Sequence, residues 1–327
     1  MRRSPSRRLA LVLACAALPS TLAAQDELPA SGGAAFLLVP VGARATALGQ
    51  AAVADAGSGE AAFWNPAGLA TLGESEFGAH YASTFISNNA ALTFHVVNRH
   101  LGTVGIAAYL VDYGSQDAVP GGGGPPTGRS ATKNVELIAS YATDVGRTVA
   151  LGVSYKLIQF RQECQGDCGT LRSLTGTTHA VDIGAQIVLG GGDALRLGVA
   201  VRHAGFKLQL ENRDQADPLP THVAVGVAYR LPLPESLTRE ALGARLLVDL
   251  QDEWGEYQDP DARVGLEFAY ADLVQLRAGY AFVESAARGP SIGIGLRLER
   301  VMIDFARVFY DSGTFDEPVY LSLRVQL

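Results

Sequence analysis

The residues best placed for chemistry in this chain are two cysteines that lie close together, Cys164 and Cys168. In an oxidising compartment such a pair forms a disulfide that closes a small loop. Metal binding is the alternative, but two thiolates with no histidine nearby are too few ligands for a zinc site. We therefore predict a disulfide between Cys164 and Cys168 and no bound metal.

A second set with chemical potential consists of arginines and carboxylates that alternate with apolar residues. Alternate residues of a strand share one face, so these charges are predicted to face partners of opposite sign on neighbouring strands. They are interpreted either as a structural ladder of ion pairs inside a barrel, or as a polar path or cargo site. The set comprises Arg245, Asp249, Arg263, Glu267, Arg277, Arg297 and Asp304, with Asp182, Arg196, Arg202 and Glu299 at the same parity.

Catalysis and cofactor binding find little support in the sequence. The six histidines show no repeated pairing with serine or carboxylate at strand spacing, which a hydrolase would need. No glycine-rich loop precedes a helix in the pattern that cradles phosphate. Acidic residues gather in the predicted loops, where solvated charge is the simplest explanation and a calcium site or divalent bridging to lipopolysaccharide is the alternative. We predict no enzyme activity and no cofactor.

Strands must position these residues, because apolar and polar residues alternate with period two over most of the chain. Near the C-terminus, Ile292, Ile294, Leu296 and Leu298 take one parity, while glycine, arginine and glutamate take the other. We predict an all-β fold in which residues 76–327 form a transmembrane antiparallel barrel of about fourteen strands. The predicted strands are 76–86, 89–98, 101–113, 133–143, 147–161, 175–189, 194–205, 221–230, 241–252, 262–270, 273–283, 290–299, 301–310 and 318–327.

The predicted connections alternate between long polar links and short turns. Outer-membrane barrels have long extracellular loops and short periplasmic turns, so the alternation places both termini in the periplasm. Two links depart from it, since 87–88 is short where a loop is expected and 231–240 is long where a turn is expected. The long links are 114–132, 162–174, 206–220, 253–261, 284–289 and 311–317.

The N-terminus has the features of a signal peptide over residues 1–24. Four arginines precede the apolar stretch 9–18 and a tail of small residues. A lipoprotein signal cut before Cys15 is the alternative, although its apolar core would be shorter than usual. Cleavage after Ala24 leaves 22 basic residues against 33 acidic ones, a net charge of −11 that argues against nucleic acid. The 37 glycines and 48% hydrophobic residues fit a barrel but would also fit a soluble sandwich.

Residues 25–75 differ from the strands that follow them, because they are rich in alanine and glycine and lack strict alternation. Residues 42–54 are predicted to form a helix with small residues on most faces. Asn65 is a good N-cap and Pro66 suits a first helical position, which predicts a short capped helix. We interpret the segment as a partly helical hatch that enters the barrel lumen and narrows it.

The same segment resembles the N-terminal signature of the PorV/PorQ family, relatives of the FadL-like outer-membrane transporters of hydrophobic compounds. Weaker similarities occur at 182–184, 277–280 and 304–306. The resemblance implies a fourteen-stranded barrel with an N-terminal hatch. One departure is the terminal Leu327, where outer-membrane strands commonly end in an aromatic residue. The resemblance rests on the runs 42–55 and 64–69, with Arg44, Gly49, Asp55, Trp64, Asn65, Pro66 and Gly68.

Two functions are compatible with the resemblance. Some members of the family take part in type IX secretion, which implies an export-associated component that binds secreted cargo or secretion-machinery proteins. The alternative is a FadL-like passive channel for small hydrophobic compounds, which needs an apolar pocket running into the lumen. In either case outer-membrane lipid and lipopolysaccharide surround the barrel.

Overall fold

The computed structural model describes residues 34–119, 124–190, 194–210, 216–239, 241–255, 257, 259–283, 288–311 and 317–327. The predicted signal peptide and the alternative lipid attachment at Cys15 lie outside these ranges. In the described part of the chain, no helix is long and apolar enough to cross a membrane.

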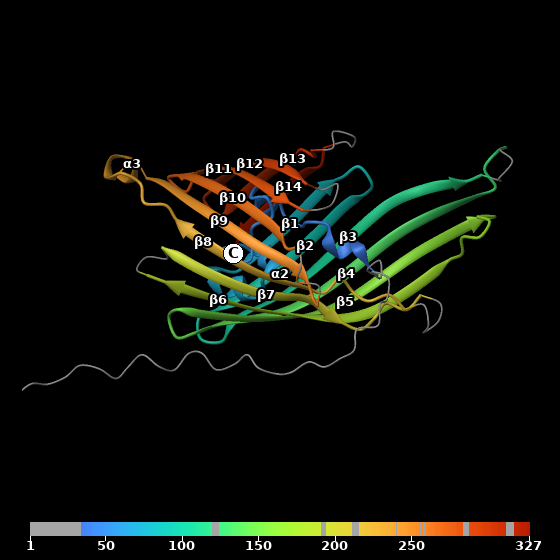
Figure 1. Cartoon of the computed structure of the whole chain (residues 1–327), viewed down its shortest axis with the longest axis horizontal. Helices are drawn as coiled ribbons and strands as arrows, with labels where there is room; N and C mark the ends of the chain where they lie inside the picture. The colour runs from blue at the N-terminus through green and yellow to red at the C-terminus, as the bar shows by residue number, and fades with distance from the viewer. Residues whose placement is uncertain are drawn as a thin grey trace, which may run out of the picture. The chain divides into compact units, whose positions relative to one another are not determined.

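Fourteen antiparallel strands form a closed barrel in which each strand pairs with its neighbours in the chain and β1 pairs with β14 (Figure 1). This confirms the predicted all-β barrel of about fourteen strands. The strands are β1 (Glu76–Ser83), β2 (Asn88–Asn98), β3 (Gly102–Ala118), β4 (Gly128–Val145), β5 (Val149–Gly166), β6 (Leu174–Leu189), β7 (Leu195–Gly205), β8 (His222–Arg230), β9 (Leu242–Glu253), β10 (Asp261–Tyr270), β11 (Val274–Phe282), β12 (Gly289–Leu298), β13 (Val301–Val308) and β14 (Val319–Gln326).

The barrel has a loop end, where the longer links join the strands, and a turn end with mostly short links. The link between β8 and β9 is the exception predicted from its length, and it carries the short helix α3 (Glu235–Arg239). The strand termini at residues 76 and 326 both lie at the turn end, because Glu76 is paired with Gln326.

The outer surface of the barrel is apolar because of the alternation in the sequence. In β12, Ile292, Ile294 and Leu296 are exposed, whereas Ser291 and Gly295 are buried in the interior. A surface of exposed isoleucine, leucine and valine around a closed barrel is stable when it faces lipid instead of water.

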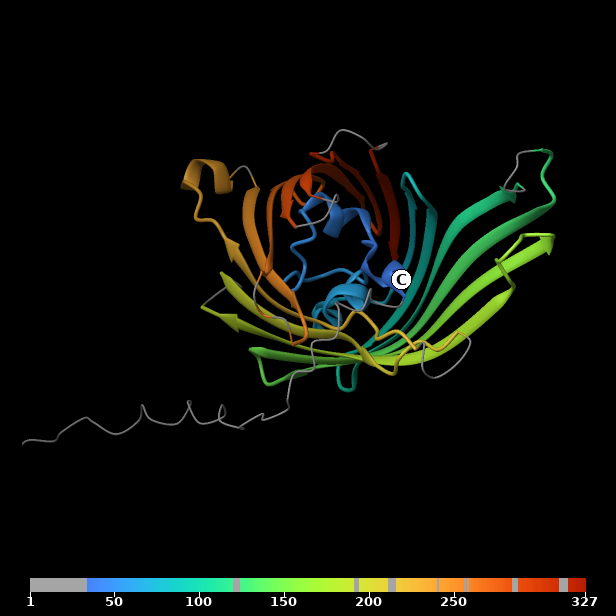
Figure 2. The ribbon, with the colours of Figure 1, turned by 45° about the vertical axis from the view of Figure 1, so that its right-hand side comes forward.

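Strands β3, β4 and β5 are longer than predicted, with 17, 18 and 18 residues. They project beyond their neighbours at the loop end (Figure 1, Figure 2). The added ends were expected to be loops because polar residues there occupy both faces, so the alternation stops. The ladder nevertheless continues, since Ser130 of β4 pairs with Gln116 of β3 and with Cys164 of β5.

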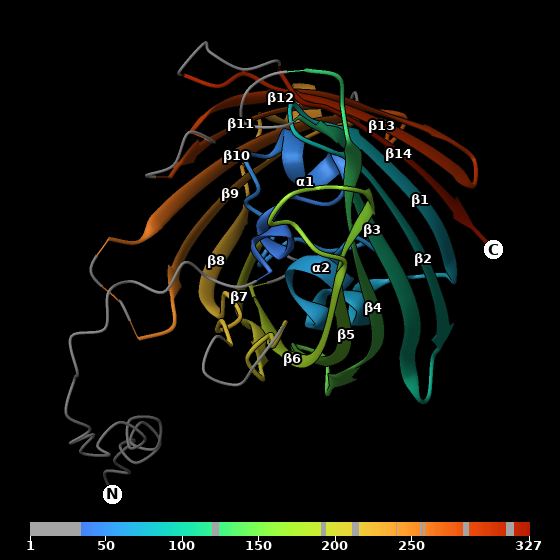
Figure 3. The same cartoon turned by 90° about the vertical axis from the view of Figure 1, so that its right-hand side faces the viewer.

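Residues 34–75, which we call the hatch, fold inside the ring of strands (Figure 3). They form η1 (Ala35–Leu38), α1 (Ala43–Ala47), α2 (Ala61–Trp64) and η2 (Pro66–Thr71). Helix α1 packs against β11 to β14, and η2 packs against β3 to β6, so the hatch spans the lumen.

The predicted helix over 42–54 is wrong beyond Ala47. Gly49 and Gln50 have φ values of 64° and 67°, a left-handed conformation that ends the helix. Gly49 also lies against the wall, where an added Cβ would be 2.6 Å from the backbone nitrogen of Tyr280. Close packing on the barrel wall therefore decides where α1 ends.

Candidate functional site

Arg44, in helix α1, ties the hatch to the barrel wall. Its Nε donates to Asp55 Oδ2 at 2.8 Å, and its Nη1 donates to Glu267 Oε2 at 2.6 Å. Arg245 of β9 completes the arrangement, with its Nη2 2.9 Å from Asp55 Oδ1 and 3.0 Å from Glu267 Oε1. Two hatch residues and two wall residues thus form one alternating set of charges.

The charged set continues around the wall towards β14. Arg277 Nε donates to Glu267 Oε2 at 2.7 Å, and its Nη1 donates to Asp304 Oδ1 at 2.6 Å. Arg324 Nη2 donates to Asp304 Oδ2 at 2.8 Å, and its Nη1 lies 3.7 Å from Glu76 Oε2. The predicted lumen charges Arg245, Glu267, Arg277 and Asp304 are therefore brought together, and the contacts form a ladder of ion pairs.

Burial and ion pairing have opposite effects on Asp55. Burial alone would raise the pKa of the carboxyl, but Arg44 and Arg245 beside it hold that pKa well below its ordinary value. The same contacts raise the pKa of Arg44 above its ordinary value despite burial. The network therefore keeps full charges inside the lumen, where an unpaired charge would be costly.

A second anchor joins the hatch to β9 through Asp249. Its Oδ2 accepts from the backbone nitrogens of Ala52 and Val53 at 2.7 and 2.8 Å. Nearby, the fully buried Asn65 donates from Nδ2 to Val53 O at 2.7 Å and accepts at Oδ1 from Ala67 N at 3.1 Å. Asn65 therefore caps η2 as predicted and also holds the preceding hatch segment.

Glu60 forms a third anchor near β1 and β14. Its Oε2 accepts from Ala45 N at 3.1 Å, and its Oε1 lies 3.7 Å from His80 Nδ1. Burial raises the pKa of Glu60 to about 7, although Arg324 lowers it in part. Ser322 Oγ lies 2.8 Å from His80 Nδ1 and accepts from Ala43 N at 2.8 Å. This serine and histidine are therefore occupied in holding the hatch.

The remaining residues of the predicted hatch motif are structural neighbours of these anchors. Trp64 donates from Nε1 to Val41 O at 3.0 Å, and Pro66 is the first residue of η2. Gly68 packs closely, since a Cβ there would be 2.9 Å from the Cβ of Ala61.

Two further predicted sites lie away from the hatch. Arg297 is half-buried near the turn end of β12, and its Nε has no hydrogen-bond partner among the described residues. Cys164 and Cys168 form a disulfide at the loop end of β5. No group of three or more metal-ligating side chains occurs in the described ranges.

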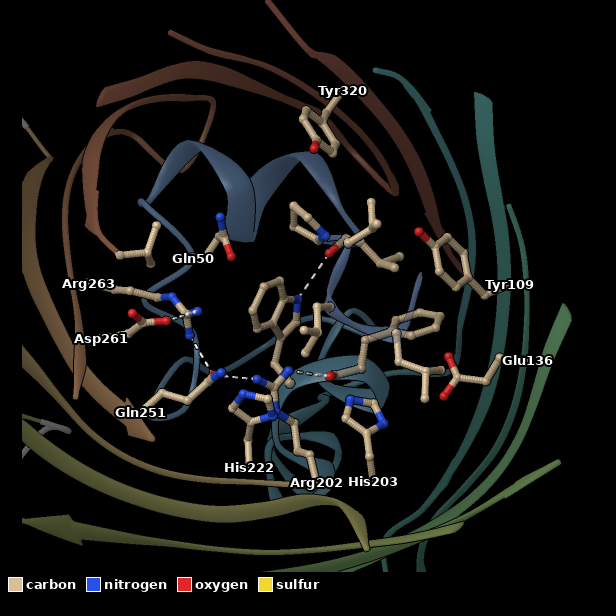
Figure 4. Close-up of a pocket in the computed structure, with 18 of the residues that line it drawn as sticks. Gln50, Tyr109, Glu136, Arg202, His203, His222, Gln251, Asp261, Arg263 and Tyr320 are labelled. Carbon is tan, nitrogen blue, oxygen red and sulfur yellow. Dashed lines mark hydrogen bonds and ion pairs between the residues drawn. The ribbon is translucent and has the colours of Figure 1, made fainter. Parts of the chain in front are cut away.

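A cavity of about 360 Å³ lies on the loop side of the hatch (Figure 4). The hatch supplies an apolar floor, and three tyrosines and Val308 continue the apolar surface on the wall. Figure 4 shows Tyr109 and Tyr320 away from the arginines, so the cavity has an aromatic side and a cationic side. The floor residues are Leu37, Leu38, Val41, Phe63 and Trp64, and the tyrosines are Tyr109, Tyr310 and Tyr320.

The charged residues of the cavity form two different arrangements. Lys156 is paired, with its Nζ 3.0 Å from Glu136 Oε1 and 2.7 Å from Asp182 Oδ2. Arg202 and Arg263 instead both donate to Gln251 Oε1, each at 2.5 Å. Of the predicted lumen charges, Arg202 and Arg263 line this cavity.

Lys156, Glu136 and Gln251 were missed as site residues, although all three have inward parity in strands that were predicted. Parity indicates that a side chain points inward, but it does not reveal which inward residues meet. Which inward residues meet depends on strand register. A bulge between Val181 and Ile183 shifts the register of β6 and β7 and lets the adjacent Arg202 and His203 both face the lumen.

No family model matches the chain, and no curated protein matches its sequence. Solved structures share its fold. The toluene transporter TbuX of Ralstonia pickettii has a TM-score of 0.61 at 14% identity, covering 89% of this chain and 100% of the transporter. The toluene transporter TodX of Pseudomonas putida has a TM-score of 0.60 at 13% identity, with coverages of 88% and 98%.

A FadL homologue of Pseudomonas aeruginosa has a TM-score of 0.53 at 11% identity, covering 88% of this chain and 99% of the homologue. The chain therefore has the fourteen-stranded FadL-like fold. These three structures do not connect it with the PorV/PorQ family in particular.

Proposed function

We propose that this chain is a bacterial outer-membrane channel for small, largely apolar molecules. The observation that carries the proposal is the cavity of about 360 Å³ between the loop end and the hatch, with an apolar floor. Ligand pockets of this kind combine apolar walls with a few polar groups that orient the ligand. The cavity lies where a molecule entering from the loop end meets the hatch.

The fold supports a channel more than an export component. Toluene transporters and a FadL homologue share it over nearly their whole length. The export-associated interpretation, with secreted cargo or secretion-machinery proteins as partners, is supported by the N-terminal motif alone. No catalytic step is part of the proposal.

The apolar outer surface supports a location in the outer membrane. Long loops at one end and mostly short turns at the other are typical of barrels whose loops face outwards. We place lipopolysaccharide around the loop end, and the N- and C-termini in the periplasm.

Passage along the barrel axis requires the hatch to shift. The network of Arg44, Asp55, Arg245 and Glu267 holds the hatch against β9 and β10, and Asp249 holds residues 52–53. The structure therefore corresponds to a closed state of the hatch. During transport we expect an intermediate in which the transported molecule fills the cavity on the loop side of the hatch.

Uptake of radiolabelled toluene by a bacterium that lacks hydrocarbon channels of its own tests the proposal. Cells that express the chain should take up toluene faster than cells with an empty vector. Leu38→Trp should slow uptake several-fold, because Leu38 lines the cavity and is 46% exposed, so a larger side chain narrows the cavity.

Leu101→Trp is the matched control, because Leu101 lies in the turn between β2 and β3 and is 68% exposed. It should leave uptake unchanged. Uptake no faster than in empty-vector cells, or equal uptake by the Leu38→Trp and Leu101→Trp variants, would contradict the channel.

A further inference from the structure

Two arginines in the cavity share one neutral partner. Arg202 Nη2 and Arg263 Nη1 both donate to Gln251 Oε1 at 2.5 Å, although one is on β7 and the other on β10 (Figure 4). Arg202 also donates from Nη1 to Phe63 O at 3.3 Å, and its guanidinium lies 5.3 Å from the centre of the Trp64 ring. The amide oxygen carries no charge to balance either cation.

The other cation that lines the cavity, Lys156, is paired with Glu136 and Asp182. Asp249 is not part of the cavity lining, and its Oδ2 accepts from two hatch amides. For the arginine pair, the described ion pairs supply one carboxylate, Asp261, whose Oδ2 is 3.6 Å from Arg263 Nη2.

The two arginines are buried, with 6% and 7% of their surfaces exposed, so their charge is poorly solvated. Arg202 Nε, Arg263 Nε and His203 Nε2 have no hydrogen-bond partner among the described residues. A buried charge without a counterion is costly, and a guanidinium recognises carboxylates through paired N–H donors. Asp261 pairs with Arg263, whereas Arg202 forms no ion pair among the described residues, so a carboxylate in the cavity would supply the partner that the Arg202 guanidinium lacks.

We propose that the cavity binds a small aromatic carboxylate, held by Arg202 and Arg263 beside Gln251, with its ring against the apolar floor at Phe63 and Trp64. This inference rests on the proposed channel function and names a substrate class for it. Aromatic side chains favour an aromatic ring through stacked or edge contacts, and the cavity is large enough for a one-ring acid. The anionic group distinguishes this ligand from a neutral hydrocarbon.

Equilibrium binding to the purified full-length protein in detergent tests the proposal with four probes. Benzoate has the ring and the charge, benzyl alcohol and toluene have the ring alone, and inorganic phosphate has the charge alone. Benzoate should bind saturably and at least about tenfold more tightly than the other three, because charge-assisted hydrogen bonds provide most of the discrimination.

Arg202→Gln and Arg263→Gln should each weaken benzoate binding about 10- to 100-fold. Arg263→Lys keeps the positive charge but loses the planar pair of guanidinium N–H donors. Its affinity for benzoate should therefore lie between those of the wild type and Arg263→Gln. Arg297→Gln is the matched control, since that arginine lies in the lumen but outside the cavity, and it should bind like wild type. Heat-modifiable gel migration shows which variants fold.

Benzyl alcohol or phosphate binding as tightly as benzoate would overturn the proposal, as would unchanged benzoate binding in a folded Arg202→Gln or Arg263→Gln variant. The toluene uptake assay separates this failure from failure of the channel. Uptake of toluene without benzoate binding overturns the carboxylate site and leaves the channel function intact.

Discussion

Asp55 couples the hatch to the barrel wall through Arg245. It accepts from Arg44 within the hatch and from Arg245 on β9, and it is 8% exposed. Removing one member of such a set leaves the other charges buried without a partner, which costs more than the intact set contributes.

Asp55→Asn should lower the free energy of unfolding by about 3–5 kcal/mol, measured by urea unfolding in detergent. Because the pKa of Asp55 is below its ordinary value, its contribution is present above the unfolded pKa of about 3.9 and is lost as the pH falls below it. Asp117→Asn is the control, since its ion pair with Arg129 is exposed and should contribute less than about 1 kcal/mol. Equal effects of the two substitutions would contradict the buried network.

Glu60 should have the opposite pH dependence. Its pKa of about 7 means that the folded protein holds the proton more tightly than the unfolded chain, whose pKa is about 4.3. Stability from this group is therefore complete below about pH 4.3 and is lost as the pH rises towards about 7.

Glu60→Gln should remove that dependence. Relative to this variant, the wild type should lose roughly 3 kcal/mol of unfolding free energy between about pH 4 and about pH 7.5. The glutamine can still accept from Ala45 N, so the variant is expected to fold. Parallel pH profiles for the two proteins would show that Glu60 does not titrate in this range.

At the scale of elements, the hatch packs against wall positions that lack side chains. An added Cβ at Gly152 of β5 would lie 2.2 Å from Pro66 C, and one at Gly184 of β6 would lie 1.8 Å from Asn65 Oδ1. Helix η2 can therefore approach the sheet closely only because these positions are glycine.

Gly152→Ala should displace η2 from the wall and cost about 1–3 kcal/mol, since the Cβ meets backbone that cannot move aside cheaply. Limited proteolysis of the protein in intact outer membranes should then cut the hatch near Asn65 faster than in the wild type. Gly243→Ala on β9 is the control, because nothing lies within 4 Å of its added Cβ. If the hatch of the Gly152→Ala variant is as protected from protease as that of the wild type, the contact between η2 and β5 adjusts to the added Cβ.

The whole molecule combines two structures with different stabilising forces. The barrel is closed by backbone hydrogen bonds from β1 through β14, and its outer face is apolar, a surface that lipid stabilises. The hatch is held by packing and by buried charges inside this ring. We expect the ring to form without the hatch, because the hydrogen-bond ladders between the described strands do not involve residues 34–72.

Deletion of residues 35–72 should therefore preserve heat-modifiable gel migration while opening the lumen. Conductance in planar bilayers should rise from a closed level to that of a water-filled pore, since a fourteen-stranded barrel is wider than the eight-stranded barrels that side chains alone can fill. The full-length chain is the control. A deleted chain that migrates as a folded barrel but does not conduct would show that side chains of the wall close the lumen unaided.

The sequence alone determined the local features of this protein. Strict alternation placed the strands, because the two faces of each strand meet different surroundings and each residue responds to its own face. Alternation failed where the surroundings become uniform, as at the polar ends of β3 to β5. The helix predicted over 42–54 was too long because the packing of Gly49 on β11 is not a local property.

Which charges meet was decided only by the tertiary structure. Arg44 and Glu267 are 223 positions apart, and Arg202, Gln251 and Arg263 come from three different strands. Inward parity marked most of these residues as candidates. Barrel closure, the bulge between β6 and β7 and the path of the hatch determine their distances, because strand register and not spacing along the chain sets which inward side chains are neighbours.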